Sequence, residues 1–498
     1  MDDGRAIQCG YGWLDPHLVM AALDESLRKS GGKHSLRRRV GIVIRSASIR
    51  SLHDIVLLSG FGADAIHPYA MFGVALGAHE EKMVEDTQEQ IARLDHLMGN
   101  LKKGIEKVIS TMGCHELRGY GRVCSSIGIA PSVAKILKSP NYFGSENVGV
   151  TWEWLDRESA ERGALLKDTE GEVKFSKVDR FYPRFWKKAG GYANSECGYG
   201  EMQKTYQQLV AESPVALRHI LKIRNVTDII NPVDVDIEVA GYSMPLVFQA
   251  MSFGSLGEIA YKAFARAASQ LNIICMNGEG GELPEMLGQD NRHRGQQVAS
   301  ARFGVNVAFL NSASVVEIKI GQGAKPGEGG MLPAYKISPK VAAARHTPPY
   351  ITLLSPSNNH DLYSIEDLAQ LIEELKMVNP LAKISVKCPV VPGIGVIAVG
   401  VAKAGADIIN LSGYDGGTGA ARMHALQHVG LPAEIGAIQA HRALTESGLR
   451  HKVELWCDGG MKTGEDAMKM ILLGANRVGF ATMALIAAGC TTCRHCNE

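Results

Sequence analysis

The chain has 498 residues, of which 45% are hydrophobic and 21% charged, and its formal net charge is +1 at pH 7. This balance is typical of a globular protein long enough for more than one domain, and nothing in it indicates a nucleic-acid or acidic-membrane partner. The N-terminus lacks the pattern of a signal peptide, and the longest apolar run, residues 478–489, is shorter than the ~20 residues that span a membrane. We therefore expect a cytoplasmic protein.

The first part of the chain, residues 1–200, contains helical patterns and few residues suited to chemistry. Residues 91–109 place apolar side chains at helical spacing, which predicts an amphipathic helix whose apolar stripe faces a core. Residues 165–204 are polar and aromatic and contain several glycines, so we interpret them as a connector. The predicted domains are therefore residues 1–200 and residues 201–498.

From about residue 240 onward, short β-rich runs alternate with helices. Two predicted helices are residues 256–271 and 365–377, and a capping box from Ser364 to Asp367 begins the second. The predicted strands are residues 246–249, 273–276, 316–320, 351–354, 384–387, 408–411, 454–457 and 477–480. Eight such units predict a (β/α)8 TIM barrel. A doubly wound open sheet is the alternative, but no glycine-rich dinucleotide fingerprint follows the first strand.

Glycines and polar side chains follow most of the predicted strands. The active site of such a barrel lies at the carboxyl ends of its strands. The densest run is KIGQGAKPGEGG at 319–330, where glycine amides and lysine ammonium groups suit a phosphate or carboxylate. Similar runs begin at Met251, Asn277, Ser412, Asp458 and Ala481. A phosphate-bearing ligand is therefore predicted, while glycines needed only for tight turns would explain any single loop.

Long motifs in the second half match one family. They are MSFGS at 251, GEGGE at 278, QQVASARFGV at 296, EIKIGQGAKPGEGG at 317, NHDLYSIEDLAQLI at 359, SGYDGGTGA at 412 and DGGMKTG at 458. In order and spacing they resemble the FMN-binding synthase domain of glutamate synthase. GFGADAIHPY at 60 and ELRGYGRVCSSIGIA at 116 are similar to part of that family's central domain. The resemblance implies an α/β flavoprotein: an FMN-binding (β/α)8 TIM barrel preceded by an α/β central-domain portion.

The resemblance also implies an oxidoreductase acting on CH-NH2 donors, in glutamate biosynthesis and ammonia assimilation. In this family ammonia and 2-oxoglutarate form 2-iminoglutarate, and reduced FMN delivers a hydride to the imine carbon to give L-glutamate. A catalytically silent FMN-binding fragment or assembly subunit is the alternative. The chain carries no recognisable amidotransferase domain, so we expect free ammonia or a separate glutaminase subunit, a separate electron-donor subunit, and an oligomer.

The residue roles implied by the resemblance fall into two sets. Lys325 and Arg345 would clamp the carboxylates of the keto acid, and Glu279 would bind ammonium or relay a proton, so these three are the predicted catalytic residues. Lys319, Ser252 and Gln297 would contact the flavin ring or ribityl chain. The other predicted cofactor-binding residues, most of them around the phosphate, are Met251, Ser412, Gly413, Gly416, Gly417, Asp458, Gly459, Gly460, Gly479, Ala481 and Thr482.

Two features depart from the family's pattern. Met331 stands where the family usually has a glutamine near the keto acid, which removes one polar contact to substrate. The family holds a [3Fe-4S] cluster with a C-x5-C-x4-C array. Cys490 and Cys496 match its first two positions, Cys493 adds a thiol, and the third position is not matched. We therefore expect an incomplete iron-sulfur site formed by these three cysteines, with a downstream segment truncated or lost.

Overall fold

The computed structural model describes residues 12–77, 86–117, 120–122, 124–167, 182–212, 214–224, 227, 229–417, 419, 421, 423–493 and 496. The chain forms two compact units, Met1–Phe175 and Ser176–Glu498. The predicted domain boundary between residues 200 and 201 falls within the second unit. Among the described residues, no helix has the length and apolar composition that a bilayer crossing requires.

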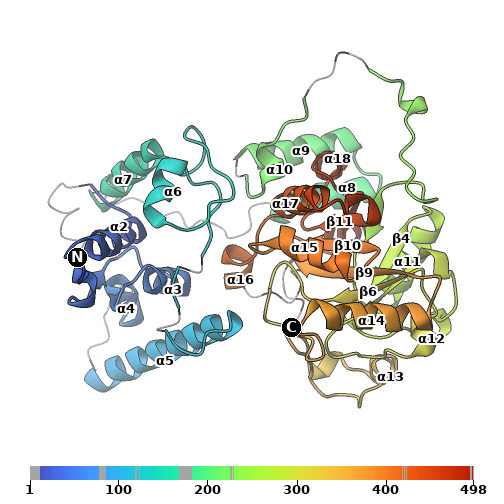
Figure 1. Cartoon of the computed structure of the whole chain (residues 1–498), viewed down its shortest axis with the longest axis horizontal. Helices are drawn as coiled ribbons and strands as arrows, with labels where there is room; N and C mark the ends of the chain where they lie inside the picture. The colour runs from blue at the N-terminus through green and yellow to red at the C-terminus, as the bar shows by residue number, and fades with distance from the viewer. Residues whose placement is uncertain are drawn as a thin grey trace. The chain divides into compact units, whose positions relative to one another are not determined.

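The first unit is mostly helical and contains a small parallel sheet (Figure 1). Its elements are α2 (Pro16–Lys29), β1 (Val43–Arg45), α3 (Leu52–Gly60), β2 (Ala65–His67), α4 (Tyr69–Ala75), α5 (Thr87–Thr111), α6 (Pro131–Leu137) and α7 (Trp152–Lys167). Met20, Ile49 and Leu58 lie in its core. Helix α5 confirms the predicted helix, but its apolar stripe is only half-buried, with Leu101 and Ile105 packed against that core.

The second unit is built around a closed barrel of eight parallel strands (Figure 1). Around the barrel they follow chain order: β3 (Leu246–Phe248), β4 (Ile274–Asn277), β5 (Arg294–Val298), β6 (Val315–Lys319), β9 (Lys383–Pro389), β10 (Ile408–Ser412), β11 (Glu454–Asp458) and β12 (Arg477–Phe480). Strand β12 closes the barrel against β3. The predicted α/β class with a (β/α)8 barrel is therefore confirmed.

Helices connect and cover the barrel strands. They are α11 (Glu258–Gln270), α12 (Val307–Leu310), α13 (Pro339–Arg345), α14 (Ile365–Val378), α15 (Ile394–Lys403), α16 (Met423–His428), α17 (Ala433–Glu446), α18 (Gly464–Leu472) and α19 (Thr482–Ala487). The predicted capping box is present at the start of α14, where the Ser364 hydroxyl and the Asp367 carboxylate each accept a backbone N–H of the other residue. Such reciprocal bonds satisfy donors that the first helical turn leaves free.

One predicted barrel strand is wrong, and one barrel strand was not predicted. Residues 351–354 overlap β8 (Leu353–Ser355), which pairs antiparallel with β7 (Gly330–Leu332) in a hairpin outside the barrel. The unpredicted strand is β5, whose sequence RGQQV is polar although all five residues are buried. Its Arg294 and Gln296 bond the buried carboxylate of Glu282, which offsets part of the cost of burying them. Lys319 therefore ends the fourth barrel strand rather than the third.

Part of the predicted connector is helical and belongs to the barrel unit. Helix α8 (Tyr182–Ala193) and helix α9 (Tyr199–Glu212) lie side by side, and the short α10 (Leu217–Ile220) follows them. Phe185 and Tyr206 pack in one apolar cluster with Ile486 of α19. Residues 168–181 lie outside the described residues. The segment before the first barrel strand is thus joined to the barrel by a core of its own.

Candidate functional site

A layer of hydrogen-bonded polar side chains crosses the inside of the barrel. The carboxylate of Glu317 accepts hydrogen bonds from Gln297 Nε2 at 2.9 Å, from Ser385 Oγ at 3.0 Å and from Asn410 Nδ2 at 2.8 Å. Glu317 and Ser385 have no exposed surface. Three hydrogen bonds to one buried carboxylate hold these side chains in one arrangement, so this layer gives the carboxyl end of the barrel a rigid polar floor.

Lys387 joins this floor to the end of β11. Its Nζ donates to Asp458 Oδ2 at 2.6 Å and to Gln249 Oε1 at 3.3 Å, while Ser412 Oγ donates to Asp458 Oδ1 at 2.5 Å. Burial alone would lower the pKa of Lys387, but the carboxylates of Asp458 and Glu317 raise it above its usual value. Gln249 Nε2 is buried and has no hydrogen-bond partner among the described residues. It is therefore a donor available to a bound group.

A second cluster centres on Glu279 in the loop after β4. Lys319 Nζ donates to Glu279 Oε1 at 3.0 Å, and Ser355 Oγ donates to Oε2 at 2.9 Å. The backbone N–H of Glu279 donates to Gln297 Oε1 at 3.1 Å. Burial would raise the pKa of Glu279, but Lys319, Ser355 and Arg345 together lower it below its usual value. This carboxylate is therefore ionised at neutral pH.

Arg345 is a buried cation without a counter-ion in the described part of the chain. It ends α13, and its side chain is 4% exposed. Its Nη2 makes only two long hydrogen bonds, 3.4 Å to Ser252 Oγ and 3.4 Å to the Phe253 carbonyl oxygen. Burial lowers the pKa of Arg345, and the charge of Glu279 opposes that shift. Because an unpaired buried charge is costly, this guanidinium is suited to receive an anion.

Lys325 lies in the loop after β6 and is 6% exposed. The backbone N–H of the preceding Ala324 donates to the Gly416 carbonyl oxygen at 2.9 Å, which joins this loop to the loop after β10. A Cβ on Gly323 would lie 1.7 Å from the Gly413 carbonyl oxygen, so only glycine permits this close approach. The two predicted keto-acid cations are therefore both buried, Lys325 in the loop after β6 and Arg345 at the end of α13.

Five of the glycines predicted to surround a phosphate, Gly413, Gly416, Gly417, Gly459 and Gly460, lie in the loops after β10 and β11. Gly413 N donates to the Asp458 carbonyl oxygen at 2.8 Å. Gly417 and Gly460 have φ of +78° and +63°. A Cβ on Gly416 would lie 2.5 Å from Asp458 Oδ1, and one on Gly417 would lie 2.2 Å from a side-chain atom of Gln322. Neighbouring protein atoms therefore explain why these positions are glycine, and phosphate binding stays a prediction.

The other predicted cofactor residues lie at the ends of β3 and β12. Met251 and Ser252 follow β3, and Gly479 lies in β12. A Cβ on Gly479 would lie 2.2 Å from Gln249 Nε2, so this glycine makes room for the unpartnered donor. Ala481 and Thr482 are the cap and first residue of α19. The structure thus gathers the predicted cofactor residues at the carboxyl end of the barrel, with Gln249 between β3 and β12.

The three C-terminal thiols are not gathered into a metal site. Cys490 Sγ accepts the Thr492 N–H at 3.4 Å, and Cys493 and Cys496 are exposed. Within the described ranges, no group of three or more Cys, His, Asp or Glu side chains is arranged to hold a metal ion. The iron-sulfur site stays a prediction from the sequence pattern.

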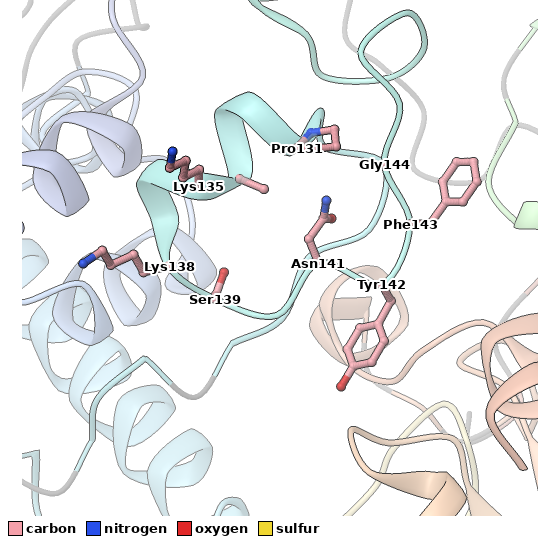
Figure 2. Close-up of a pocket in the computed structure, with 9 residues that line it drawn as sticks. Pro131, Lys135, Lys138, Ser139, Asn141, Tyr142, Phe143 and Gly144 are labelled. Carbon is pink, nitrogen blue, oxygen red and sulfur yellow. The ribbon is translucent and has the colours of Figure 1, made fainter. Parts of the chain in front are cut away.

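A separate hollow of about 580 Å³ lies in the first unit, beside α6 (Figure 2). Figure 2 shows Asn141 within it. Its amide is already bonded, because Nδ2 donates to the Ile129 carbonyl oxygen at 2.8 Å and Oδ1 accepts from Ser126 at 3.1 Å. Lys138 on its wall pairs with Glu25. None of the predicted site residues lines this hollow, so the barrel mouth is the candidate site.

Several site residues were missed by sequence reasoning. Lys387 had a usable signal, because a charged residue within the apolar run ISVKCP is rare unless it is paired. Gln249 and Glu317 lie within predicted strands and were not predicted to be site residues. Ser355 was not identifiable as a site residue, because it ends β8, a hairpin strand, whereas the sequence pattern of residues 351–354 predicts a barrel strand. Their common role is to hold the predicted residues in place.

Known proteins similar to this chain agree on one family. The family model "Conserved region in glutamate synthase" matches residues 192–498, and the model "Glutamate synthase central domain" matches residues 1–130. The NADPH glutamate synthase large chain of Bacillus subtilis is 35% identical over 509 residues, which is 97% of this chain and 32% of the relative. The large chain from Azospirillum brasilense is 35% identical over 488 residues, 94% of this chain and 32% of the relative.

The ferredoxin-dependent glutamate synthase of Pyropia yezoensis is 34% identical over 530 residues, covering 97% of this chain and 34% of the relative. The chain therefore spans about a third of the length of these relatives. The first family model alone covers more than half of the chain and includes the whole barrel with its polar floor. On these matches, the chain belongs to the glutamate synthase family.

Proposed function

We propose that this chain carries the synthase chemistry of its family, the FMN-dependent reductive amination of 2-oxoglutarate to L-glutamate through 2-iminoglutarate. The observation that supports it most is Arg345, a buried guanidinium with no carboxylate within ion-pair distance among the described residues. A dicarboxylate substrate would supply the missing anion. Glu279 and Lys319 lie in the same part of the barrel and supply the charges that ammonium and a reduced flavin need.

The residues at the barrel mouth fit a flavin mononucleotide. Gln249 offers a buried N–H donor that has no partner among the described residues, and the bond from Gly413 N to the Asp458 carbonyl oxygen joins the loops after β10 and β11. Lys319, Met251, Ser252 and Gln297 would hold the ring and ribityl chain, and the glycine loops would hold the phosphate. When bound and reduced, FMN would supply the hydride for reduction of the imine.

The chain's own residues bind and orient the two substrates. Arg345 and Lys325 would each bind one carboxylate of 2-oxoglutarate, which fixes the keto carbon in the barrel mouth. Glu279 would bind ammonium, because its lowered pKa keeps it charged and makes it a poor proton donor at neutral pH. Lys319 and Ser355 hold its two carboxylate oxygens in position.

Ammonia and electrons would reach this site from other proteins or from solution. The names of the similar proteins include both NADPH and ferredoxin forms. We include in the proposal a separate glutaminase and a separate electron-donor subunit.

Binding of the keto acid to the FMN-loaded chain tests the proposal. The flavin absorption spectrum is recorded while 2-oxoglutarate is added, and pyruvate, which lacks the distal carboxylate, serves as the comparison ligand. We expect saturable binding of 2-oxoglutarate and binding of pyruvate weaker by about tenfold or more, because one charge-assisted clamp is lost. A chain that retains no FMN, or that binds both acids equally, would contradict the proposal.

A further inference from the structure

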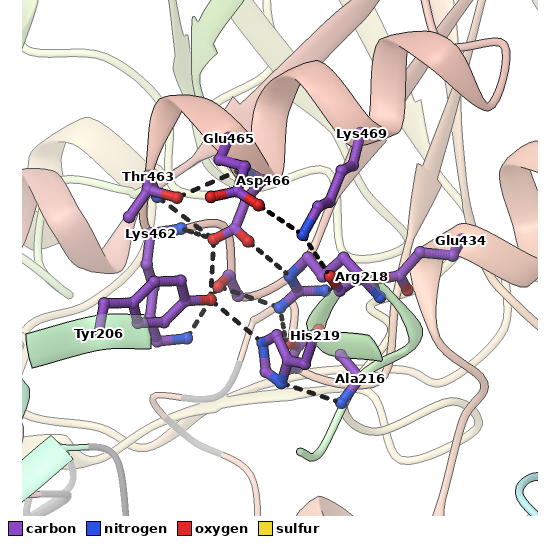
Figure 3. A network of polar contacts seen from close by, with 12 residues as sticks. Tyr206, Ala216, Arg218, His219, Glu434, Lys462, Thr463, Glu465, Asp466 and Lys469 are labelled. Atoms are coloured by element: carbon purple, nitrogen blue, oxygen red, sulfur yellow. Dashed lines mark hydrogen bonds and ion pairs between the residues drawn. The ribbon is translucent and has the colours of Figure 1, made fainter. Parts of the chain in front are cut away.

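A fully buried arginine lies outside the residues assigned so far. Arg218 belongs to α10, before the first barrel strand, and its side chain is 1% exposed. Its Nη1 and its backbone N–H each donate to Glu434 Oε1 at 3.0 Å. Its Nε lies 3.7 Å from Asp466 Oδ1. Figure 3 shows the guanidinium between Asp466 on one side and Glu434 on the other.

The same guanidinium bonds both glycine loops, which are residues 413–417 after β10 and residues 459–461 after β11. Arg218 Nη2 donates to Asp415 Oδ2 at 3.0 Å and to the Gly460 carbonyl oxygen at 3.1 Å. Asp415 lies in the loop after β10, and Gly460 lies in the loop after β11. One side chain from outside the barrel therefore joins the two loops that carry most of the predicted phosphate residues.

Asp415 completes this connection. Cβ atoms on Gly459 and Gly460 would lie 2.6 Å from its Oδ1 and 1.8 Å from its Oδ2, so the carboxylate packs directly on the second loop. Asp415 Oδ1 is buried and has no hydrogen-bond partner among the described residues. Without Arg218, this carboxylate would place an uncompensated negative charge beside the site predicted for a phosphate.

The charges around Arg218 explain why it stays in place. The carboxylates of Glu434, Asp415 and Asp466 surround it, and they raise its pKa well above the usual value although burial opposes this. Burial and the charge of Arg218 lower the pKa of His219 to about 2, so this ring adds no charge. Tyr206 donates its hydroxyl to Asp466 Oδ2 at 2.9 Å, which bonds α9 to the same cluster.

We propose that Arg218 is a positioning residue for the phosphate of the cofactor: through Asp415 and Gly460 it fixes the loops after β10 and β11 and neutralises the carboxylate beside them. The proposal rests on the proposed function, because it assumes that these loops bind a flavin phosphate monoester. Arg218 itself contacts neither substrate nor cofactor in this account. The effect is therefore specific to the phosphate and leaves the flavin ring's own contacts unchanged.

The test compares FMN with riboflavin, which has the same ring and ribityl chain but no phosphate. Dissociation constants of both flavins are measured by fluorescence for the wild type, Arg218→Met and Asp415→Ala. We expect the FMN constant to rise about tenfold or more in Arg218→Met, which loses both the loop contact and the compensating charge, and to rise less in Asp415→Ala, which also loses the negative charge beside the phosphate. The riboflavin constant should change less than about threefold in both variants. An FMN to riboflavin ratio in Arg218→Met equal to that of the wild type would overturn the proposal.

Arg477→Met is the matched control. Arg477 is equally buried and pairs with Glu454 at 2.9 Å, but it begins β12 at the opposite end of the barrel. A purely structural effect would change both flavins alike in the control and in the test variants. Since Arg218→Met leaves several carboxylates unpaired, hydrogen exchange of the loops in Asp415→Ala decides the question if that variant does not fold.

Hydrogen exchange of the flavin-free protein provides a second readout. Amides of residues 413–417 and 458–461 should exchange faster in Arg218→Met and Asp415→Ala than in Arg477→Met. Equal exchange in all three would overturn the positioning role. Failure of the wild type to bind FMN would instead overturn the proposed function, while this exchange comparison would still decide whether Arg218 fixes the loops.

Discussion

Replacing either of two buried arginines, Arg345 or Arg294, with methionine should affect stability very differently. Arg345→Met removes a charge with no counter-ion among the described residues and two hydrogen bonds of 3.4 Å. Arg294→Met removes a guanidinium that donates to Glu282 at 2.5 Å and to Tyr261 at 2.7 Å. The first loses these long bonds, a contact with the Phe303 ring at 5.5 Å and the attraction of Glu279, but it also relieves the desolvation of a charge. Its free energy of unfolding should therefore change by less than about 1 kcal/mol. The second leaves a buried carboxylate unpaired and should lose about 3–5 kcal/mol.

The effects on kcat/KM should follow the reverse order, with the larger loss in Arg345→Met. If Arg345 binds 2-oxoglutarate as proposed, Arg345→Met removes a charge-assisted contact of about 1.5–3 kcal/mol, which corresponds to a loss of about ten- to 150-fold in kcat/KM. Urea denaturation of the flavin-free protein, followed by circular dichroism, measures the stability, and steady-state kinetics measure kcat/KM. The reasoning would be refuted if Arg345→Met destabilised the protein as much as Arg294→Met, or if it left kcat/KM unchanged.

The remaining predictions concern Glu279 and the glycine loops. Folding lowers the pKa of Glu279 from 4.5, so its ionised form stabilises the fold above that pH. The difference in unfolding free energy between wild type and Glu279→Gln should therefore shrink as pH falls below 4.5. A difference independent of pH would contradict this. Ser355→Ala removes a hydrogen bond to the Glu279 carboxylate and should move the acid limb of the kcat/KM profile to higher pH, whereas an unmoved limb would exclude this role. Gly460→Ala should weaken FMN binding, because its Cβ would lie 1.8 Å from a carboxylate oxygen. Gly448 is also at positive φ but in open space, so Gly448→Ala should lower the free energy of unfolding by only about 1 kcal/mol and leave FMN bound. Equal FMN affinity in the two variants would argue against the loop geometry.

The barrel was predictable from the sequence because most of its strands are apolar runs bounded by turns. Strand β10 illustrates this, since Ile408, Ile409 and Leu411 are fully buried. Strand β5 was not predictable by the same reasoning, because its polar residues are buried against Glu282, a partner that only the tertiary structure supplies. Residues 351–354 show the opposite error. They form an apolar run that predicts a buried strand, but Leu354 is exposed in a hairpin outside the barrel.

The candidate site was predictable to a different extent. The resemblance to the family indicated Glu279, Lys319 and Arg345, and the structure places the first two 3.0 Å apart. It could not indicate Arg218, which lies 197 residues before Asp415 in the chain. Local sequence predicts which residues carry charge after a strand, but the counter-charges that position them come from distant elements.

We propose that the barrel mouth converts 2-oxoglutarate and ammonia into glutamate with a hydride from reduced FMN. The most direct measurement is a single turnover without oxygen: FMN bound to the purified chain is reduced chemically, 2-oxoglutarate and ammonium are added, and flavin reoxidation and glutamate are both quantified. We expect one glutamate per reoxidised flavin and no reaction when either substrate is omitted. Flavin that stays reduced in the presence of both substrates, or that reoxidises without forming glutamate, would contradict it.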